Sequence, residues 1–185
     1  MDSTANLKHH LLIAMPTMND SWFGHSVCYI CDHNDQGSMG LVINKPMGIQ
    51  LSDVLSELDI TPSQPVNFPI MQGGPVSPEQ GFVLYRGHEL AVQNLNIDDD
   101  VYLTTSKDIL ANVAKGEGPE EIRICLGYAG WEAGQLEQEI LDNSWLTVAA
   151  DPDLLFNTPI DKILEAAAKK IGVDMRLLSG DAGHA

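Results

Sequence analysis

Four potential metal ligands lie within nine residues of the chain: His25, Cys28, Cys31 and His33. Thiolates and imidazoles are the ligands that zinc prefers, but a C-x-x-C pair chelates only where a tight turn brings both sulfur atoms together. The residues between the two cysteines are tyrosine and isoleucine, which favour a strand, and strand residues three apart point to opposite faces. We therefore expect no metal and two small packed side chains, with a metal or dithiol site as the alternative.

Two glycine clusters are candidates for close approach of the backbone to a ligand. Gly73 and Gly74 follow a predicted strand, and the spacing G-x-x-G-x-x-x-G covers residues 127–134, between a predicted strand and a predicted helix. Neither cluster matches a phosphate-binding fingerprint, so turn glycines are the simpler interpretation. Tyr128 and Trp131 keep a binding role open, because they would lie beside a helix N-terminus that accepts an anion or a carbonyl.

Several polar or glycine residues that packing does not require fall at the ends of predicted strands and the starts of predicted helices. Such places offer free backbone N–H groups and a favourable dipole to an anionic or carbonyl-bearing ligand. We expect the four segments that carry them to converge on one concave surface, with four separate turns as the alternative. The candidate ligand-binding residues are Asn44, Lys45, Gly73, Gly74, Thr105, Ser106, Tyr128, Trp131 and Gln135.

Catalytic signatures are absent from the sequence. It contains neither G-x-S-x-G nor H-E-x-x-H, and no serine that sequence alone pairs with a histidine base. The acidic run from Asp98 to Asp100 is typical of a solvated loop. We therefore expect no catalytic residue and no cofactor, and favour a role without enzymatic activity while leaving that question open.

The secondary structure that must position these residues consists mostly of strands in the first part of the chain, with helices interspersed in the later part. One helix begins at Thr158 and Pro159 and ends at Gly172. Another covers 107–115 after a cap at Thr105 or Ser106. A third covers 133–142, with Glu137 and Glu139 facing water. A shorter helix starts near Ser52. This order favours an α+β fold with a mixed sheet. The predicted strands are His10–Met15, Ser26–Cys31, Met39–Asn44, Phe68–Met71, Gly81–Tyr85, Val101–Thr105, Glu121–Leu126 and Trp145–Val148.

Length and charge limit the class of protein. The chain has 185 residues, of which 44% are hydrophobic, which fits one domain over residues 1–185. Twenty-six acidic residues against 10 basic ones give a net charge of -16, which repels nucleic acid and anionic membranes. The absence of a secretory signal or apolar span, together with an odd number of cysteines, indicates a cytoplasmic protein with reduced thiols.

Several motifs along the chain together resemble the YqgE/AlgH family of bacterial proteins. They are HHLLIAMP at 9–16, SVCYICDHNDQGSMGLVINKP at 26–46, GGPV at 73–76, GFVL at 81–84, TTS at 104–106, LGYAGWEAGQLEQEILDNSWL at 126–146, LLF at 154–156 and GHA at 183–185. The resemblance implies an α+β fold with a bifurcated sheet that partly curls into a small barrel, flanked by helices. One branch of the family bears a transcriptional-regulator name, but the resemblance implies no established reaction.

Three hypotheses for function follow from the sequence. The first is a binding protein without enzymatic activity, whose partner is an unknown protein or small molecule and whose effect on transcription is indirect. The second is an enzyme or a protein that binds a nucleotide or anionic metabolite in a cleft between GGPV and GYAGW. The third, a direct DNA-binding regulator, is disfavoured because no predicted helix has a basic face. The sequence makes no prediction of oligomeric state.

Overall fold

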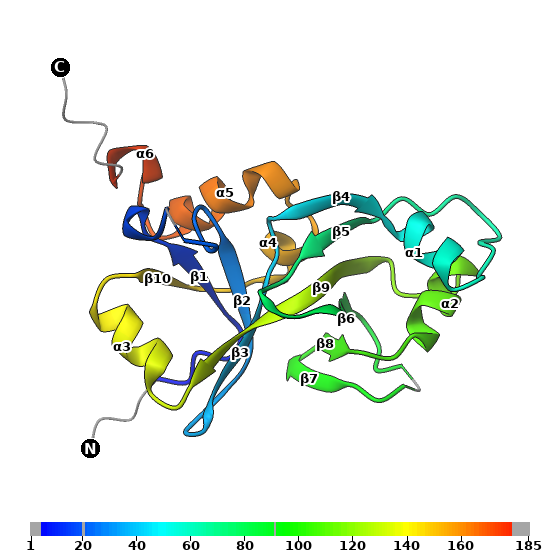
Figure 1. Ribbon diagram of the computed structural model, residues 1–185, viewed down its shortest axis with the longest axis horizontal. Coiled ribbons are helices and arrows are strands. Elements are labelled where there is room, and N and C mark those ends of the chain that lie inside the picture. The colour runs from blue at the N-terminus through cyan, green and yellow to red at the C-terminus, as the bar shows by residue number, and fades with distance from the viewer. Residues whose placement is uncertain (1–4, 20, 91, 179–185) are drawn as a thin grey trace.

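Ten strands in the described part of the chain form one sheet around the long strand β9, Glu121–Glu132 (Figure 1). The computed structural model describes residues 5–19, 21–90 and 92–178, so the predicted GHA motif at 183–185 lies outside the described residues. The order along the main path is β10-β1-β2-β3-β9-β6-β8-β7, and β4 pairs with β5, which pairs with β9. The other strands are β1 His10–Ala14, β2 Val27–Asn34, β3 Gly37–Val42, β4 Pro46–Gln50, β5 Pro69–Gln72, β6 Val76–Arg86, β7 Leu95–Asp98, β8 Val101–Thr104 and β10 Trp145–Ala149.

The sheet divides along β9. The first half of β9 lies between β5 and β6, with Ile124 opposite Ile70 in the parallel pair and opposite Val83 in the antiparallel pair. The second half pairs with β3 instead, with Ala129 opposite Gly40. The bifurcated mixed sheet expected from the family resemblance is therefore confirmed.

The sheet also curls, so that its second and last strands approach one another. His9, just before β1, lies with its Nε2 atom 3.4 Å from Oδ2 of Asp98, the last residue of β7. Leu11 of β1, Tyr29 of β2 and Leu103 of β8 pack in one core cluster inside this curl. The barrel-like part of the fold is thus confirmed as a half-barrel filled by apolar side chains.

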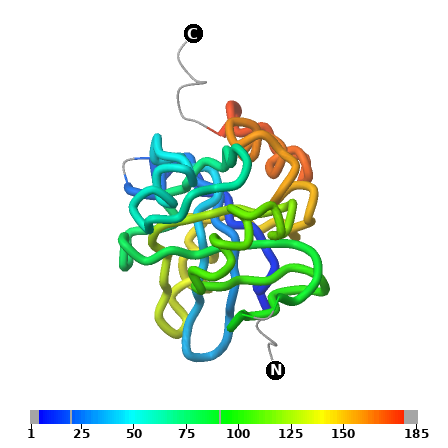
Figure 2. The backbone as a smooth tube through the Cα atoms, turned by 90° about the vertical axis from the view of Figure 1, so that its right-hand side faces the viewer, coloured from blue at the N-terminus to red at the C-terminus, as the bar shows by residue number. Residues whose placement is uncertain are grey.

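Six α-helices of the described residues cover the sheet from different sides. α1 and α2 pack on a cluster around Ile70 and Tyr85, whereas α5 packs on the half-barrel core and α3 on a third cluster around Trp131. Figure 2 shows the C-terminal helices at the opposite end of the view from the β2–β3 hairpin. Their bounds are α1 Leu51–Glu57, α2 Asp108–Ala114, α3 Gln135–Leu141, α4 Pro152–Phe156, α5 Ile163–Lys170 and α6 Met175–Leu178.

The largest difference between the predicted and the observed elements concerns the GYAGW motif. The sequence predicts a strand-to-helix turn there, but Tyr128 and Trp131 lie inside β9, and α3 begins only after Gly134. The strands β4 and β7 and the helices α4 and α6 have no counterpart among the predicted elements. The helix expected from Thr158 begins as a 3-10 turn at Ile160, and the Thr158 hydroxyl donates to the Asp153 carbonyl instead of capping it.

None of the helices in the described ranges is long and apolar enough to span a bilayer.

Candidate functional site

Asn44 and Lys45 attach the segment of residues 15–26 to the sheet. The Asn44 side chain accepts from the Val27 N–H at 2.8 Å and donates to the His25 carbonyl at 3.0 Å. Lys45 Nζ donates to the Trp22 carbonyl at 2.9 Å and lies 3.7 Å from the centroid of the Trp22 ring. Partial burial lowers the pKa of Lys45. Both predicted binding residues therefore already have partners within the chain.

The glycines of GGPV bring β9 into direct backbone contact with the turn after β5. A Cβ atom on Gly74 would lie 1.9 Å from the carbonyl carbon of Tyr128, and one on Gly73 would lie 2.4 Å from the Gly127 carbonyl oxygen. Gly127 itself has a φ of 78°, a left-handed conformation that favours glycine. The GGPV and GYAGW segments are therefore in direct backbone contact at these glycines.

All three tryptophans of the protein, with Phe23, form a chain of ring contacts, the tryptophan cluster. The Phe23 ring centroid lies 4.9 Å from that of Trp22, 6.4 Å from that of Trp131 and 5.5 Å from that of Trp145. Because Lys45 lies over Trp22, this cluster connects the Asn44–Lys45 segment with Trp131 in β9. Aromatic side chains with polar edges commonly form binding surfaces.

Three of the four predicted segments are neighbours in the structure. The Gln72 N–H donates to the Lys45 carbonyl at 2.7 Å, which brings GGPV next to the Asn44–Lys45 segment, and GGPV touches GYAGW. Ser106 lies elsewhere: its hydroxyl accepts from the Asp108 N–H at 3.3 Å at the start of α2, and Thr105 is exposed beside it. Binding of a ligand at any of these residues stays a prediction.

Glu139 of α3 is a functional candidate that helical spacing alone places in water. Its Oε1 atom accepts from the indole Nε1–H groups of Trp131 at 3.0 Å and of Trp145 at 2.9 Å. Its Oε2 atom accepts from the amide of Gln135 at 3.0 Å, and Gln135 in turn accepts from the Glu132 N–H at 2.9 Å. The carboxylate thus holds α3 and the tryptophan cluster together.

A second set of polar side-chain contacts joins α3 to the β2–β3 hairpin. His33 Nδ1 lies 2.7 Å from Ser38 Oγ, and His33 Nε2 lies 3.1 Å from Oε1 of Glu137, which the sequence also places in water. Serine, histidine and an acid in this order have the composition of a catalytic triad. Only 5% of the His33 side chain is exposed, however, because it lies between the sheet and α3. The contacts of His33 with Ser38 and Glu137 therefore anchor α3 to the hairpin.

The cysteines are packed as the sequence predicts. Cys28 belongs to the core cluster under α3 and Cys31 to the half-barrel core, which confirms that the two side chains point to opposite faces. Burial raises the pKa of all three thiols, that of Cys125 to about 12. The described residues contain no group of three or more His, Cys, Asp or Glu side chains arranged to hold a metal ion.

We expect the folded protein to resist thiol reagents, because Cys28, Cys31 and Cys125 are 0% exposed and a thiol of raised pKa forms little thiolate. A chromogenic disulfide reagent at pH 8 should modify all three thiols in denaturant within seconds, and should react with the native protein only as it unfolds. Rapid modification of one thiol in the native protein would contradict the described packing.

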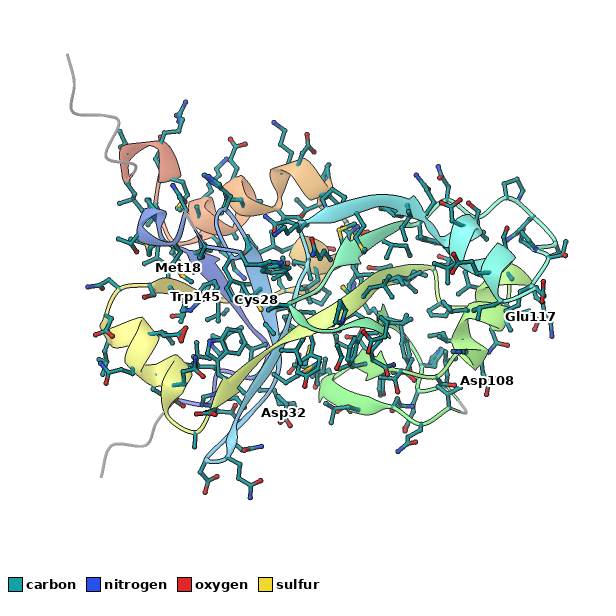
Figure 3. The ribbon with its side chains drawn as sticks, in the orientation of Figure 1. Met18, Cys28, Asp32, Asp108, Glu117 and Trp145 are labelled. Carbon is teal, nitrogen blue, oxygen red and sulfur yellow. The ribbon has the colours of Figure 1, made fainter. Side chains whose placement is uncertain are left out.

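The described surface includes two hollows of different size. The larger, about 580 Å³, lies along α5 and α6, with Leu164, Ala168 and Val173 as its apolar wall and Lys169 on its rim. The smaller, about 250 Å³, lies on the β2–β3 hairpin and is lined in part by Asp32. In Figure 3 the Asp32 side chain lies on the side of the hairpin away from α3. Neither hollow contains the predicted GGPV or Asn44–Lys45 residues.

The curled, bifurcated sheet and the contacts of its motifs define a known class of bacterial protein. The chain belongs to the AlgH-like family, whose model matches residues 11–176. It is similar to the AlgH protein from Pseudomonas aeruginosa, with 47% identity and a TM-score of 0.79 over 100% of this chain and 99% of that one. A UPF0301 protein from Thioalkalivibrio sulfidiphilus is 48% identical over 100% of both chains, and one from Vibrio cholerae is 46% identical over 97% and 100%.

Proposed function

We propose that this protein acts by binding another protein, and that the partner's contact surface is basic. The observation that carries the proposal is the uncompensated negative charge. Of the 10 Lys and Arg residues, six already bind within the chain, and the ion pairs of the described residues neutralise only five carboxylates through Lys or Arg. Asp35, Glu57 and Glu117 are examples of exposed acids with no ion pair in the described structure.

The electric field of a negatively charged protein attracts basic proteins and raises their rate of association, whereas it repels nucleic acid. The internal use of Lys45, Gln135 and Glu139 supports the same proposal, because their side-chain groups are already occupied by contacts that stabilise the fold. An effect on transcription would then be indirect, through the partner protein.

A small-molecule ligand is the second candidate, and the groove along α5 and α6 favours it. Its volume of about 580 Å³ falls within the range that holds small ligands. A thermal-shift screen of nucleotides, acyl phosphates and sugar phosphates separates the two candidates, because a ligand at about 100 times its Kd stabilises a protein by roughly 2.7 kcal/mol.

The proposal is tested by retention of cellular proteins on the immobilised chain. We expect basic proteins to be retained at about 50 mM NaCl and released by about 300 mM NaCl, because screening shortens the reach of surface charge. A purified retained protein should bind the chain directly, with a Kd that rises at least about ten-fold over this range. Retention of acidic proteins alone, or binding that salt does not weaken, would contradict the proposal.

A further inference from the structure

We propose that the partner docks on the outer edge of β10 by adding an extended segment to the sheet. This inference rests on the proposed function and specifies how the partner is held. Recognition through an added strand needs a sheet edge with unpaired N–H and C=O groups and room for side chains on both faces.

The hydrogen bonding of β10 determines which groups face outward. β1 pairs with β10 with no register shift, and bonds join Met15 N–H to the Ser144 carbonyl and Ala150 N–H to the His9 carbonyl. Because bonded pairs alternate along an antiparallel ladder, the backbone groups of Trp145, Thr147 and Ala149 point away from β1. Among the described residues, only Lys170 reaches them, donating from Nζ to the Ala149 carbonyl at 2.6 Å.

The other edges of the sheet are protected in ways that β10 is not. β4 begins with Pro46 and contains Gly48 at a φ of 82° with an irregular register, which disrupts pairing on its outer side. β7 has four residues, ends in Asp98 and closes against His9. β10, with the sequence WLTVA, has no proline, no charge and no bulge. Apart from the contact of Lys170 with the Ala149 carbonyl, this edge is unprotected, and such an edge is an aggregation risk unless a partner covers it.

Exposed apolar side chains flank both ends of the β10 edge. Leu141, at the end of α3 and four residues before β10, is 75% exposed, and Ile171, which follows Lys170 at the end of α5, is 40% exposed. Figure 1 shows β10 between α3 and α5. Leu146 and Val148 face the half-barrel core, and Trp145 faces the tryptophan cluster. An added strand with alternating apolar residues would therefore place these residues on one face and extend one of these two apolar surfaces.

The occupant to which we commit is an extended segment of a different protein, with basic residues next to its apolar part, because the chain carries a net charge of -16. Asp142, which precedes β10, has no ion pair among the described residues, whereas Asp151, which follows β10, is paired with Lys170 at 2.8 Å, so the uncompensated acid lies at the Trp145 end of the edge. A second copy of this chain is the weaker occupant, because two molecules of charge -16 repel each other.

The test uses a synthetic peptide of alternating threonine and valine with two lysines at each end, and a matched peptide with glutamates in place of the lysines. We expect the lysine peptide to shift the backbone amide NMR signals of Thr147 and Ala149 and to slow their hydrogen exchange at least about ten-fold. The glutamate peptide should bind at least about ten-fold more weakly.

Thr147→Pro is the variant that separates docking from folding. It removes an outward N–H that makes no bond to β1, so the fold is retained, and it should abolish peptide binding. Thr147→Val keeps the N–H and should bind normally. Three results would overturn the inference: no peptide binding at about millimolar concentration, signal shifts confined to another face, or a dimer that Thr147→Pro converts to monomer. If the peptide does not bind, or shifts signals on another face, basic proteins should still be retained on the immobilised protein. Failure of the docking proposal can therefore be told apart from failure of the proposed function.

Discussion

Gly74→Ala is expected to abolish stable folding, with a loss in the free energy of unfolding above about 4 kcal/mol. The new Cβ atom would lie 1.9 Å from the Tyr128 carbonyl carbon and 2.4 Å from the Ala129 nitrogen. These are backbone atoms of the strand around which the sheet is built, so neither can move without breaking the pairing of β9 with β3. Urea unfolding followed by circular dichroism measures the loss.

Gly81→Ala is the matched control for Gly74→Ala. Gly81 also lies next to β9, in β6, but a Cβ there would meet its nearest neighbour at 3.9 Å, an ordinary contact. We expect a change below about 1 kcal/mol, of either sign. Equal stability of the two variants would show that GGPV and GYAGW are not in backbone contact.

Glu139→Leu is expected to lower the free energy of unfolding by about 3 kcal/mol, because it leaves two poorly exposed indole N–H groups without an acceptor. It should also change the intrinsic fluorescence, since both tryptophans lose the same carboxylate. Urea unfolding monitored by tryptophan emission measures both effects.

The control here is Glu139→Gln, whose amide oxygen still accepts from the indole groups. We expect it to lose about 1 kcal/mol, the difference between a charged and a neutral acceptor. A loss below about 1 kcal/mol in the leucine variant as well would contradict a role of the carboxylate contacts in attaching α3.

The strands of the fold can be predicted where apolar runs are long, as in β1 and in the first half of β9. The GYAGW motif is misplaced by sequence reasoning because glycines usually end a strand, whereas Gly127 lies within β9 and is needed for contact with Gly74. That requirement comes from a segment about 50 residues away along the chain, a relation that local sequence does not reveal.

In the candidate site, too, local sequence identifies some of the residues, but their contacts depend on the tertiary fold. Asn44 and Lys45 can be singled out as polar residues at a strand end, but their partners Trp22 and His25 come from a segment without periodicity. Helical spacing assigns Glu139 to the solvent-exposed face of α3, whereas in the structure its carboxylate accepts from the Trp145 indole. The position of Trp145, which reverses that assignment, depends on the return of the chain into β10.

The edge of β10 is outside the reach of sequence reasoning, although the strand itself is predicted. A run such as WLTVA is typical of a buried strand, and nothing in it indicates that one side pairs with β1 while the other faces solvent. The neighbours in the sheet decide this, and these depend on pairings between residues over 100 positions apart.

The rate constant of association between this chain and a purified retained partner, measured as a function of ionic strength, tests the central claim most directly. Stopped-flow tryptophan fluorescence gives the association and dissociation rates separately. If the acidic surface recognises a basic protein, the association rate should fall at least about ten-fold between about 50 and 300 mM NaCl while the dissociation rate changes little. An association rate that does not depend on salt would contradict the claim.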